Sequence, residues 1–241
     1  MVDAHDKKRV PPMLLIAHRG APALALENTL RSIQIAEGLD ADGTEFDVRG
    51  TRDGVPVLLH DKTLERMWGL PQPVEAVDFA QVRALRAASP DGVVELIPTF
   101  EEVLDGTRAT LIIDSKSIPV IPALAESLRR RNAFERVRFI GEPPILEAVR
   151  KTVPDARIIM SWARPELPPA DLVERIRPFA INLRWDEDSP NTARLFAREG
   201  FELWTYTIDD PALARAALEA GVRGIISNDV AAVRDVVRGR A

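Results

Sequence analysis

Short apolar runs alternate with helical patterns along most of this chain of 241 residues. Each run is long enough for one buried strand, and the stretch after it carries apolar residues at helical spacing. The predicted strands are 13–17, 43–48, 109–114, 137–140, 156–160, 180–183, 202–206 and 224–226. Strand-then-helix alternation predicts a parallel sheet, and about eight such units in a chain of this length favour a closed (β/α)8 TIM barrel.

An open, doubly wound α/β sheet is the alternative fold. The glycine fingerprint GxGxxG, which marks the first turn of many such sheets, does not follow the strand predicted at 13–17. The sequence therefore favours the barrel.

Several helix starts are marked by capping residues. Thr99 and Glu102 have the spacing of a capping box. Asp171, Asn191 and Asp210 stand near the start of later helical patterns and are predicted N-caps.

The domain organisation follows from where the alternation holds. Residues 1–12 are polar and end in two prolines, which predicts a flexible N-terminal lead-in. Residues 13–241 are predicted to form a single barrel domain. The irregular, proline-containing stretch from about 61 to 98 is predicted to be a small insertion after the second strand unit, too short to bury a core of its own.

Composition narrows the class of partner and the location. The net charge is −5, whereas nucleic-acid-binding proteins usually carry a basic face, so no nucleic-acid partner is expected. Cysteine is absent, which excludes disulfides and thiolate metal sites. No apolar run reaches the length of a signal-peptide core or a spanning helix. We therefore expect a cytoplasmic protein without stable membrane insertion, and the oligomeric state is left open.

Two histidines and two carboxylates punctuate the region between residues 13 and 61. His18 ends the first strand, Glu45 and Asp47 lie two apart on the second, and His60 follows a further apolar run. Residues i and i+2 of a strand face the same side, so Glu45 and Asp47 share a face. On an edge hairpin this pair would be an ordinary solvated face, but inside a barrel it needs a compensating cation.

A third carboxylate, Asp114, ends the strand at 109–114 and is followed by Lys116. Alone, this pair is equally consistent with a structural ion pair. Because the active sites of TIM barrels lie at the C-terminal ends of the strands, we expect Asp114 to join Glu45 and Asp47. Three oxygen ligands suit one divalent cation, Mg2+ or Ca2+ with Mn2+ as a further candidate. Trp204 also stands at a predicted strand end and is expected to form a wall of the substrate pocket, with core packing as the alternative.

Over nearly its whole length, the chain resembles the glycerophosphodiester phosphodiesterase family. The block from His18 to His60 is the most specific part of this resemblance. The matching segments are His18-Arg19-Gly20, Glu27-Asn28-Thr29, Glu45-Phe46-Asp47-Val48, Asp53-Gly54-Val55-Pro56-Val57, His60-Asp61, the stretch 97–104, Asp114-Ser115-Lys116, Trp204-Thr205 and the stretch 221–226. The resemblance implies a phosphoric diester hydrolase with a TIM-barrel fold and a small insertion after the second catalytic histidine.

The resemblance also implies a role for each site residue. A phosphodiester is anionic, so its cleavage requires charge neutralisation, an activated nucleophile and protonation of the leaving group. The substrate implied is a small-molecule phosphodiester, cleaved to sn-glycerol 3-phosphate and an alcohol. The implied roles are general acid and base for His18 and His60, phosphate contact for Arg19 and Lys116, and metal coordination for Glu45, Asp47 and Asp114.

Departures from the family pattern leave an alternative function open. Asp114 stands where the family usually has glutamate, and an aspartate there is similar to the related sphingomyelinase D and lysophospholipase D enzymes. Ile140-Gly141 and Ser227-Asn228 replace the usual Ser-Phe and Thr-Asp on the substrate side. The alternative is a phospholipase D-like activity on lysophospholipids or sphingolipids. Its apolar rim would come from Leu64, Met67, Trp68, Leu70 and Pro71, for which core packing is the other reading.

A non-catalytic barrel that binds a phosphorylated ligand is the third hypothesis. The presence of both histidines and all three carboxylates argues against it.

Overall fold

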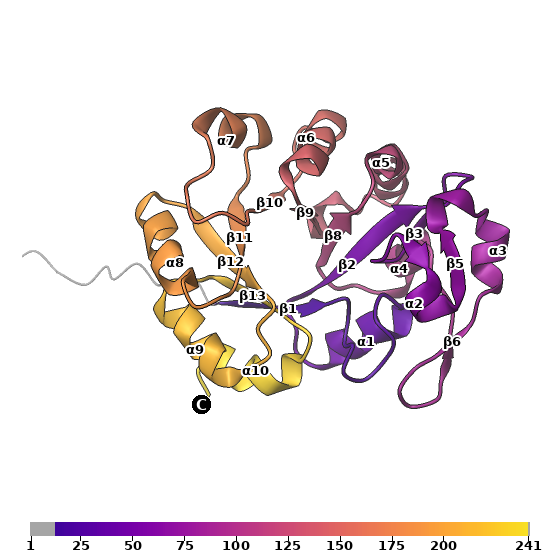
Figure 1. Ribbon diagram of the computed structural model, residues 1–241, viewed down its shortest axis with the longest axis horizontal. Helices are drawn as coiled ribbons and strands as arrows, with labels where there is room; N and C mark the ends of the chain where they lie inside the picture. The colour runs from indigo at the N-terminus through magenta and orange to yellow at the C-terminus, as the bar shows by residue number, and fades with distance from the viewer. Residues whose placement is uncertain (1–12, 241) are drawn as a thin grey trace, which may run out of the picture.

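The computed structural model describes residues 13–240, and the lead-in predicted for residues 1–12 lies outside them. Eight parallel strands follow one another in the order β1-β13-β12-β11-β10-β9-β8-β2, and β2 pairs with β1 to close the ring. Helices surround this barrel (Figure 1). The predicted (β/α)8 TIM barrel is confirmed.

The barrel strands agree closely with the predicted ones. The strands are β1 (Leu14–His18), β2 (Gly43–Gly50), β8 (Leu111–Ser115), β9 (Val137–Gly141), β10 (Ile158–Ser161), β11 (Ala180–Arg184), β12 (Glu202–Tyr206) and β13 (Gly224–Ser227). The helices are α1 (Leu30–Gly38), α4 (Phe100–Gly106), α5 (Ile121–Arg130), α6 (Pro143–Thr152), α7 (Ala170–Ile176), α8 (Ser189–Arg198), α9 (Pro211–Glu219) and α10 (Val230–Val237), with short 3-10 helices at Ile118–Val120 and Phe134–Arg136.

Two of the capping predictions hold and two are wrong. Thr99 and Glu102 form a reciprocal capping box at α4, and Asp210 accepts hydrogen bonds from the first backbone N–H groups of α9. Asp171 and Asn191 are not N-caps. Asp171 lies in the first turn of α7, which begins after Pro169, and Asn191 lies inside α8. The N-caps are Pro169 and Asp188, two and three residues before the predicted ones. In both cases a proline at or just inside the helix start favours this earlier beginning. No helix within residues 13–240 has both the length and the apolar character needed to cross a bilayer.

The segment after β2 forms a small layer of its own beside the barrel, at the right of Figure 1. Its elements are β3 (Pro56–Leu58), β4 (Thr63–Leu64), α2 (Glu65–Trp68), β5 (Leu70–Pro73), a 3-10 helix at Val74–Ala76, α3 (Phe79–Ala84), β6 (Ala87–Ala88) and β7 (Val94–Glu95). β3 runs antiparallel to β2 and attaches the layer to the barrel.

The insertion buries a small apolar cluster together with β3, the strand that precedes it and pairs with β2. Leu64, Trp68, Val74 and Val82 pack there with residues of β3 and its flanks. The cluster is possible because β3 supplies part of it, so the insertion shares a core with the barrel edge.

Trp204 fills the interior of the barrel. Its side chain is 2% exposed and its ring lies across Gly224, where an added Cβ would approach the ring to 2.4 Å. The ring meets Phe179 edge-on, with 6.1 Å between centroids, and its Nε1 donates to Glu202 Oε1 at 3.0 Å. Phe179 precedes β11 and Glu202 begins β12, so the indole closes the N-terminal end of the barrel.

We expect Gly224→Ala to lower the free energy of unfolding by about 1–3 kcal/mol, because the new methyl group overpacks the Trp204 ring. Chemical denaturation monitored by circular dichroism measures the change. The matched control is Gly38→Ala, since an added Cβ at that helical position meets nothing within 4 Å. Equal stability of the two variants would contradict the packing argument.

Candidate active site

A cavity of about 390 Å3 opens at the C-terminal ends of the barrel strands. Its wall also includes Ser161, Asn182 and Tyr206, from the neighbouring strands β10, β11 and β12. The predicted site residues that line it are His18, Arg19, Glu45, Asp47, His60, Asp114 and Lys116.

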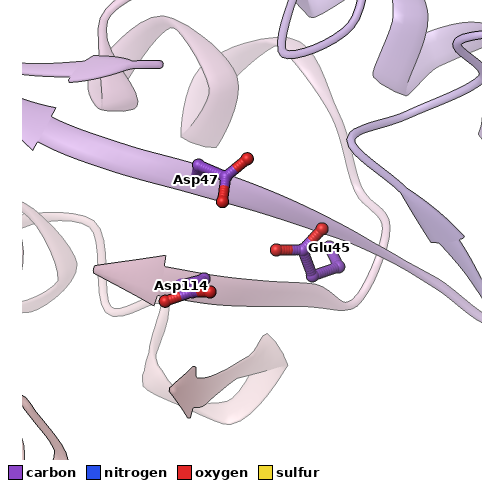
Figure 2. Close-up of side chains that lie close together, drawn as sticks. All are labelled: Glu45, Asp47 and Asp114. Carbon is purple, nitrogen blue, oxygen red and sulfur yellow. The ribbon is translucent and has the colours of Figure 1, made fainter. Parts of the chain in front are cut away.

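Three carboxylates converge on one side of this cavity. Glu45 and Asp47 project from β2, and Asp114 projects from the neighbouring strand β8, in register with Asp47 (Figure 2). Each offers an oxygen atom within 4.8 Å of the other two. Glu45 and Asp47 are only 4% and 1% exposed. Like charges this close, and this poorly solvated, must be compensated by hydrogen bonds or by positive charge.

Asp47 is the carboxylate that the protein compensates most fully. Asn28 Nδ2 donates to Asp47 Oδ2 at 2.9 Å, and Asn28 Oδ1 accepts from the Asp47 backbone N–H at 3.0 Å. Lys116 Nζ lies 2.9 Å from Asp47 Oδ1, and Arg19 Nε lies 3.2 Å from Oδ2. Burial alone would raise the pKa of Asp47, but the two cations and the Asn28 hydrogen bond outweigh it and lower this pKa. Asp47 is therefore ionised at neutral pH.

Glu45 and Asp114 are compensated less well. Burial, followed by repulsion from Asp47 and Asp114, raises the pKa of Glu45 well above its usual range. Burial is also the main reason that the pKa of Asp114 rises to about 6, although Lys116 acts against it. The only hydrogen bond to the Glu45 side chain from the described residues comes from the Arg19 backbone N–H, at 3.3 Å.

This oxygen-only set fits one divalent cation. The three carboxylates are close enough to share an ion, and the pKa values of Glu45 and Asp114 are raised, so a bound cation would stabilise the ionised form of both. Carboxylate oxygens are the ligands that Mg2+ and Ca2+ prefer.

Two cationic side chains border the carboxylates. Lys116 Nζ lies 2.6 Å from Asp114 Oδ2 as well as 2.9 Å from Asp47 Oδ1. Burial by itself would lower the pKa of Lys116, but the two carboxylates raise it above its usual value and keep the ammonium charged. Arg19 Nη1 donates to Glu27 Oε1 at 3.0 Å, which orients its guanidinium toward Asp47.

His18, at the end of β1, is held by side chains that follow β12 and β13. Its Nδ1 lies 2.6 Å from Asn228 Oδ1, and Asn228 Nδ2 donates to Asp209 Oδ2 at 2.9 Å. An amide oxygen only accepts hydrogen bonds, so Nδ1 carries the proton and Nε2 is left to exchange one. Burial is the main cause that lowers the pKa of His18, so the ring is neutral at pH 7.

His60 is oriented from the insertion. Its Nδ1 lies 2.8 Å from Asp61 Oδ1, and its side chain is 37% exposed. Asp61 also pairs with Arg66 of α2, and that hydrogen bond is the main reason that the pKa of Asp61 falls to about 2. Arg66 Nη2 then donates to Glu27 Oε1 at 2.7 Å, next to Arg19. The insertion thus links the His60 side of the cavity to the loop after β1.

Trp204 does not reach the cavity, and its prediction as a substrate wall is corrected. Alternate residues of β12 face the barrel interior, so Trp204 and Tyr206 share a face but lie at different depths. Tyr206, at the C-terminal end of the strand, is the aromatic residue that lines the cavity.

Other site residues were not assigned a role from the sequence. Asn28 belongs to the motif Glu27-Asn28-Thr29, and Asn228 belongs to the pair Ser227-Asn228, which departs from the usual Thr-Asp. Asn182 and Tyr206 carry the weaker signal of a polar side chain near the end of a buried strand. Asp209 gave no signal, because its role depends on Asn228, 19 positions later in the chain.

We expect Glu45→Gln to stabilise the metal-free protein at pH 8 by about 2 kcal/mol, because it removes a buried like charge. Since the pKa of Glu45 is raised on folding, its unfavourable contribution is absent below the unfolded-state pKa and grows as the pH rises toward the folded-state value. The gain should therefore shrink toward pH 4. Thermal unfolding in a chelator, at both pH values, measures it.

Glu45→Gln should also abolish the rise in melting temperature that Mg2+ or Ca2+ gives the unsubstituted protein. Glu142→Gln is the matched control, since Glu142 lines the same cavity but is exposed. An unchanged metal response in Glu45→Gln would remove Glu45 from the ligand set.

Comparisons with known proteins agree with this geometry. The model of the Glycerophosphoryl diester phosphodiesterase family matches residues 18–232. A glycerophosphodiester phosphodiesterase of Caldanaerobacter subterraneus is 29% identical over 237 residues, which cover 93% of this chain and 98% of that protein. A lysophospholipase D of Mus musculus is 44% identical over 71 residues, which cover 30% of this chain and 22% of that protein.

A solved structure has the same fold. The phosphodiesterase of Oleispira antarctica, in complex with the product sn-glycerol-3-phosphate, has a TM-score of 0.84 at 20% identity, covering 94% of this chain and 97% of that one. The family match spans His18, His60 and all three carboxylates. The chain belongs to the glycerophosphoryl diester phosphodiesterase family and is an enzyme of the phosphoric diester hydrolase class.

Proposed function

We propose that the protein hydrolyses glycerophosphodiesters to sn-glycerol 3-phosphate and an alcohol, with a divalent cation and with His18 and His60 as the proton-transfer pair. The observation that carries this proposal is the convergence of two imidazoles, three carboxylates and two cations on one cavity of a chain in this family. The net charge of −5 supports a small-molecule diester as the partner rather than a nucleic acid, and the cytoplasm is the proposed location.

Glu45, Asp47 and Asp114 would hold the cation, with Mg2+ or Ca2+ as the first candidates and Mn2+ as a third. The chemistry that such an ion supplies is withdrawal of charge from the phosphoryl oxygens. Lys116 and Arg19 lie beside the same carboxylates, so their cationic groups can bind the remaining phosphoryl oxygens and favour the additional negative charge of the transition state.

The two histidines have suitable but different surroundings. His18 donates from Nδ1 to Asn228, so its neutral ring presents Nε2 to remove the proton from the attacking hydroxyl. That oxygen forms a bond to phosphorus while the bond to the leaving oxygen breaks. His60, whose Nδ1 faces the Asp61 carboxylate, would supply the proton for the leaving oxygen. The same arrangement serves attack by the neighbouring glycerol hydroxyl, followed by hydrolysis of a cyclic phosphate, and direct attack by water.

Purified protein with glycerophosphocholine or glycerophosphoethanolamine should release sn-glycerol 3-phosphate in the presence of Mg2+, Ca2+ or Mn2+, and a chelator should stop the reaction. His18→Ala and His60→Ala should each lower kcat by about 10²- to 10⁴-fold, because each removes a proton-transfer group. Enzymatic determination of sn-glycerol 3-phosphate measures both. Inert diesters, or histidine variants as active as the unsubstituted protein, would rule out this function.

Lys116→Met should raise KM and lower kcat, with a combined loss in kcat/KM of at least about 100-fold, since it removes a charge next to the bound phosphate. Lys151→Met, on the exposed side of α6, is the matched control and should keep full activity. Steady-state kinetics on glycerophosphocholine separates the two parameters. Equal losses in both variants would mean that Lys116 acts only through the overall charge.

A phospholipase D-like activity on lysophospholipids or sphingolipids is the second candidate. Asp114 and the partial likeness to a lysophospholipase D favour it. Of the rim predicted for it, Leu64 and Trp68 are buried in the insertion cluster, Met67 and Leu70 are half-buried against that cluster, and only Pro71 is exposed. The exposed apolar residues Leu24 and Ile118 lie instead in the loops after β1 and β8.

Kinetics on glycerophosphocholine and lysophosphatidylcholine compares the two functions directly, because these substrates differ only in the acyl chain. We expect kcat/KM to be at least about 10-fold higher for the deacylated diester, since two isolated apolar side chains bury little of an acyl chain. A preference for the acylated substrate that falls in a Leu24→Ser, Ile118→Ser double variant would favour the second candidate.

A further inference from the structure

Asn182 on β11 is a buried amide with an unpaired end in the cavity wall. Its side chain is 2% exposed, and its Oδ1 has no hydrogen-bond partner among the described residues. Its Nδ2 makes one long contact, 3.4 Å to the Oγ of Ser161, the residue in register with it on β10. A buried acceptor without a donor is costly, so its position calls for a ligand that supplies a donor.

The location of Asn182 restricts what that ligand can be. β11 stands across the ring from β2, which carries Glu45 and Asp47. Both strands line the same cavity, so a diester whose phosphate binds on the carboxylate side can reach Asn182 with one of its organic substituents. Phosphoryl oxygens only accept hydrogen bonds, so the donor must be a hydroxyl or an ammonium group of a substituent.

We propose that Asn182 accepts a hydrogen bond from the terminal hydroxyl of the glycerol unit and so selects glycerol diesters over diesters of simpler diols. This inference rests on the proposed function. A glycerol unit esterified at one end always carries this hydroxyl, whereas some leaving alcohols, such as choline, have no donor. A neutral amide that is shielded from water is suited to a neutral hydroxyl rather than to a charged ammonium group.

The test compares two substrates that differ only in this hydroxyl. Glycerophosphocholine has it, and the phosphocholine ester of propane-1,2-diol lacks it but keeps the hydroxyl next to the esterified carbon. We expect the unsubstituted protein to favour glycerophosphocholine by about 10- to 100-fold in kcat/KM, because the analogue leaves the amide unpaired. Asn182→Leu, which has a similar volume and no acceptor, should reduce this preference to less than about threefold.

The ratio of the two rates does not depend on the fraction of protein that is folded, so a less stable variant still gives a clear answer. Asn182→Val is the second acceptor-free variant. Ile181→Val is the matched control, since Ile181 faces the helices rather than the cavity, and it should keep the full preference.

Each outcome is decisive. Equal rates on both substrates in the unsubstituted protein, or an undiminished preference in both Asn182 variants, would overturn the inference and leave the proposed function standing. Variants that keep the glycerol preference, but change the ratio between choline and ethanolamine diesters, would show that Asn182 contacts the leaving alcohol instead. A protein that cleaves no glycerophosphodiester would refute the proposed function, and this inference with it.

Discussion

Repulsion among three closely spaced carboxylates is the constraint on which the rest of the site depends. Oxygen atoms of Glu45, Asp47 and Asp114 lie within 4.8 Å of one another, and the first two side chains are buried while Asp114 is half-buried in the cavity wall. The protein compensates Asp47 with Asn28, Arg19 and Lys116, and leaves the other two with raised pKa values. An incomplete compensation of this kind disfavours the metal-free folded state and at the same time increases the affinity for a dication.

The two ends of the barrel have different roles: apolar packing at one end stabilises the fold, and polar side chains at the other form the candidate active site. At the N-terminal end Trp204 packs across Gly224 and closes the interior. At the C-terminal end the cavity is lined by polar side chains. Their orientation depends on further hydrogen-bond partners: Asp209 accepts from Asn228, and Arg66 pairs with Asp61. The insertion belongs to this second end, since its small apolar cluster fixes α2, and α2 carries Arg66.

Much of the fold and part of the candidate site could be predicted, because the sequence patterns that indicate them involve residues close together in the chain. The strand bounds follow from apolar runs, and the sharing of one face by Glu45 and Asp47 follows from the two-residue period of a strand. The same period misled the prediction for Trp204, because it fixes the face of a residue but not its depth, and Tyr206 shares that face two residues later. The insertion shares its apolar cluster with Val57 and Leu59, in β3 and just after it, so this packing depends on a contact with the edge of the barrel.

The sequence by itself determined the barrel, its eight strand-and-helix units and the side chains that we propose hold a cation and transfer protons. The tertiary structure alone decided which groups support them. His18 meets Asn228 across 210 positions of the chain, and Asn182 enters the cavity wall only because ring closure sets β11 opposite β2. Hydrogen bonds act over about 3 Å, so such pairings depend on the register of strands that lie far apart in the sequence. No local sequence pattern encodes that register.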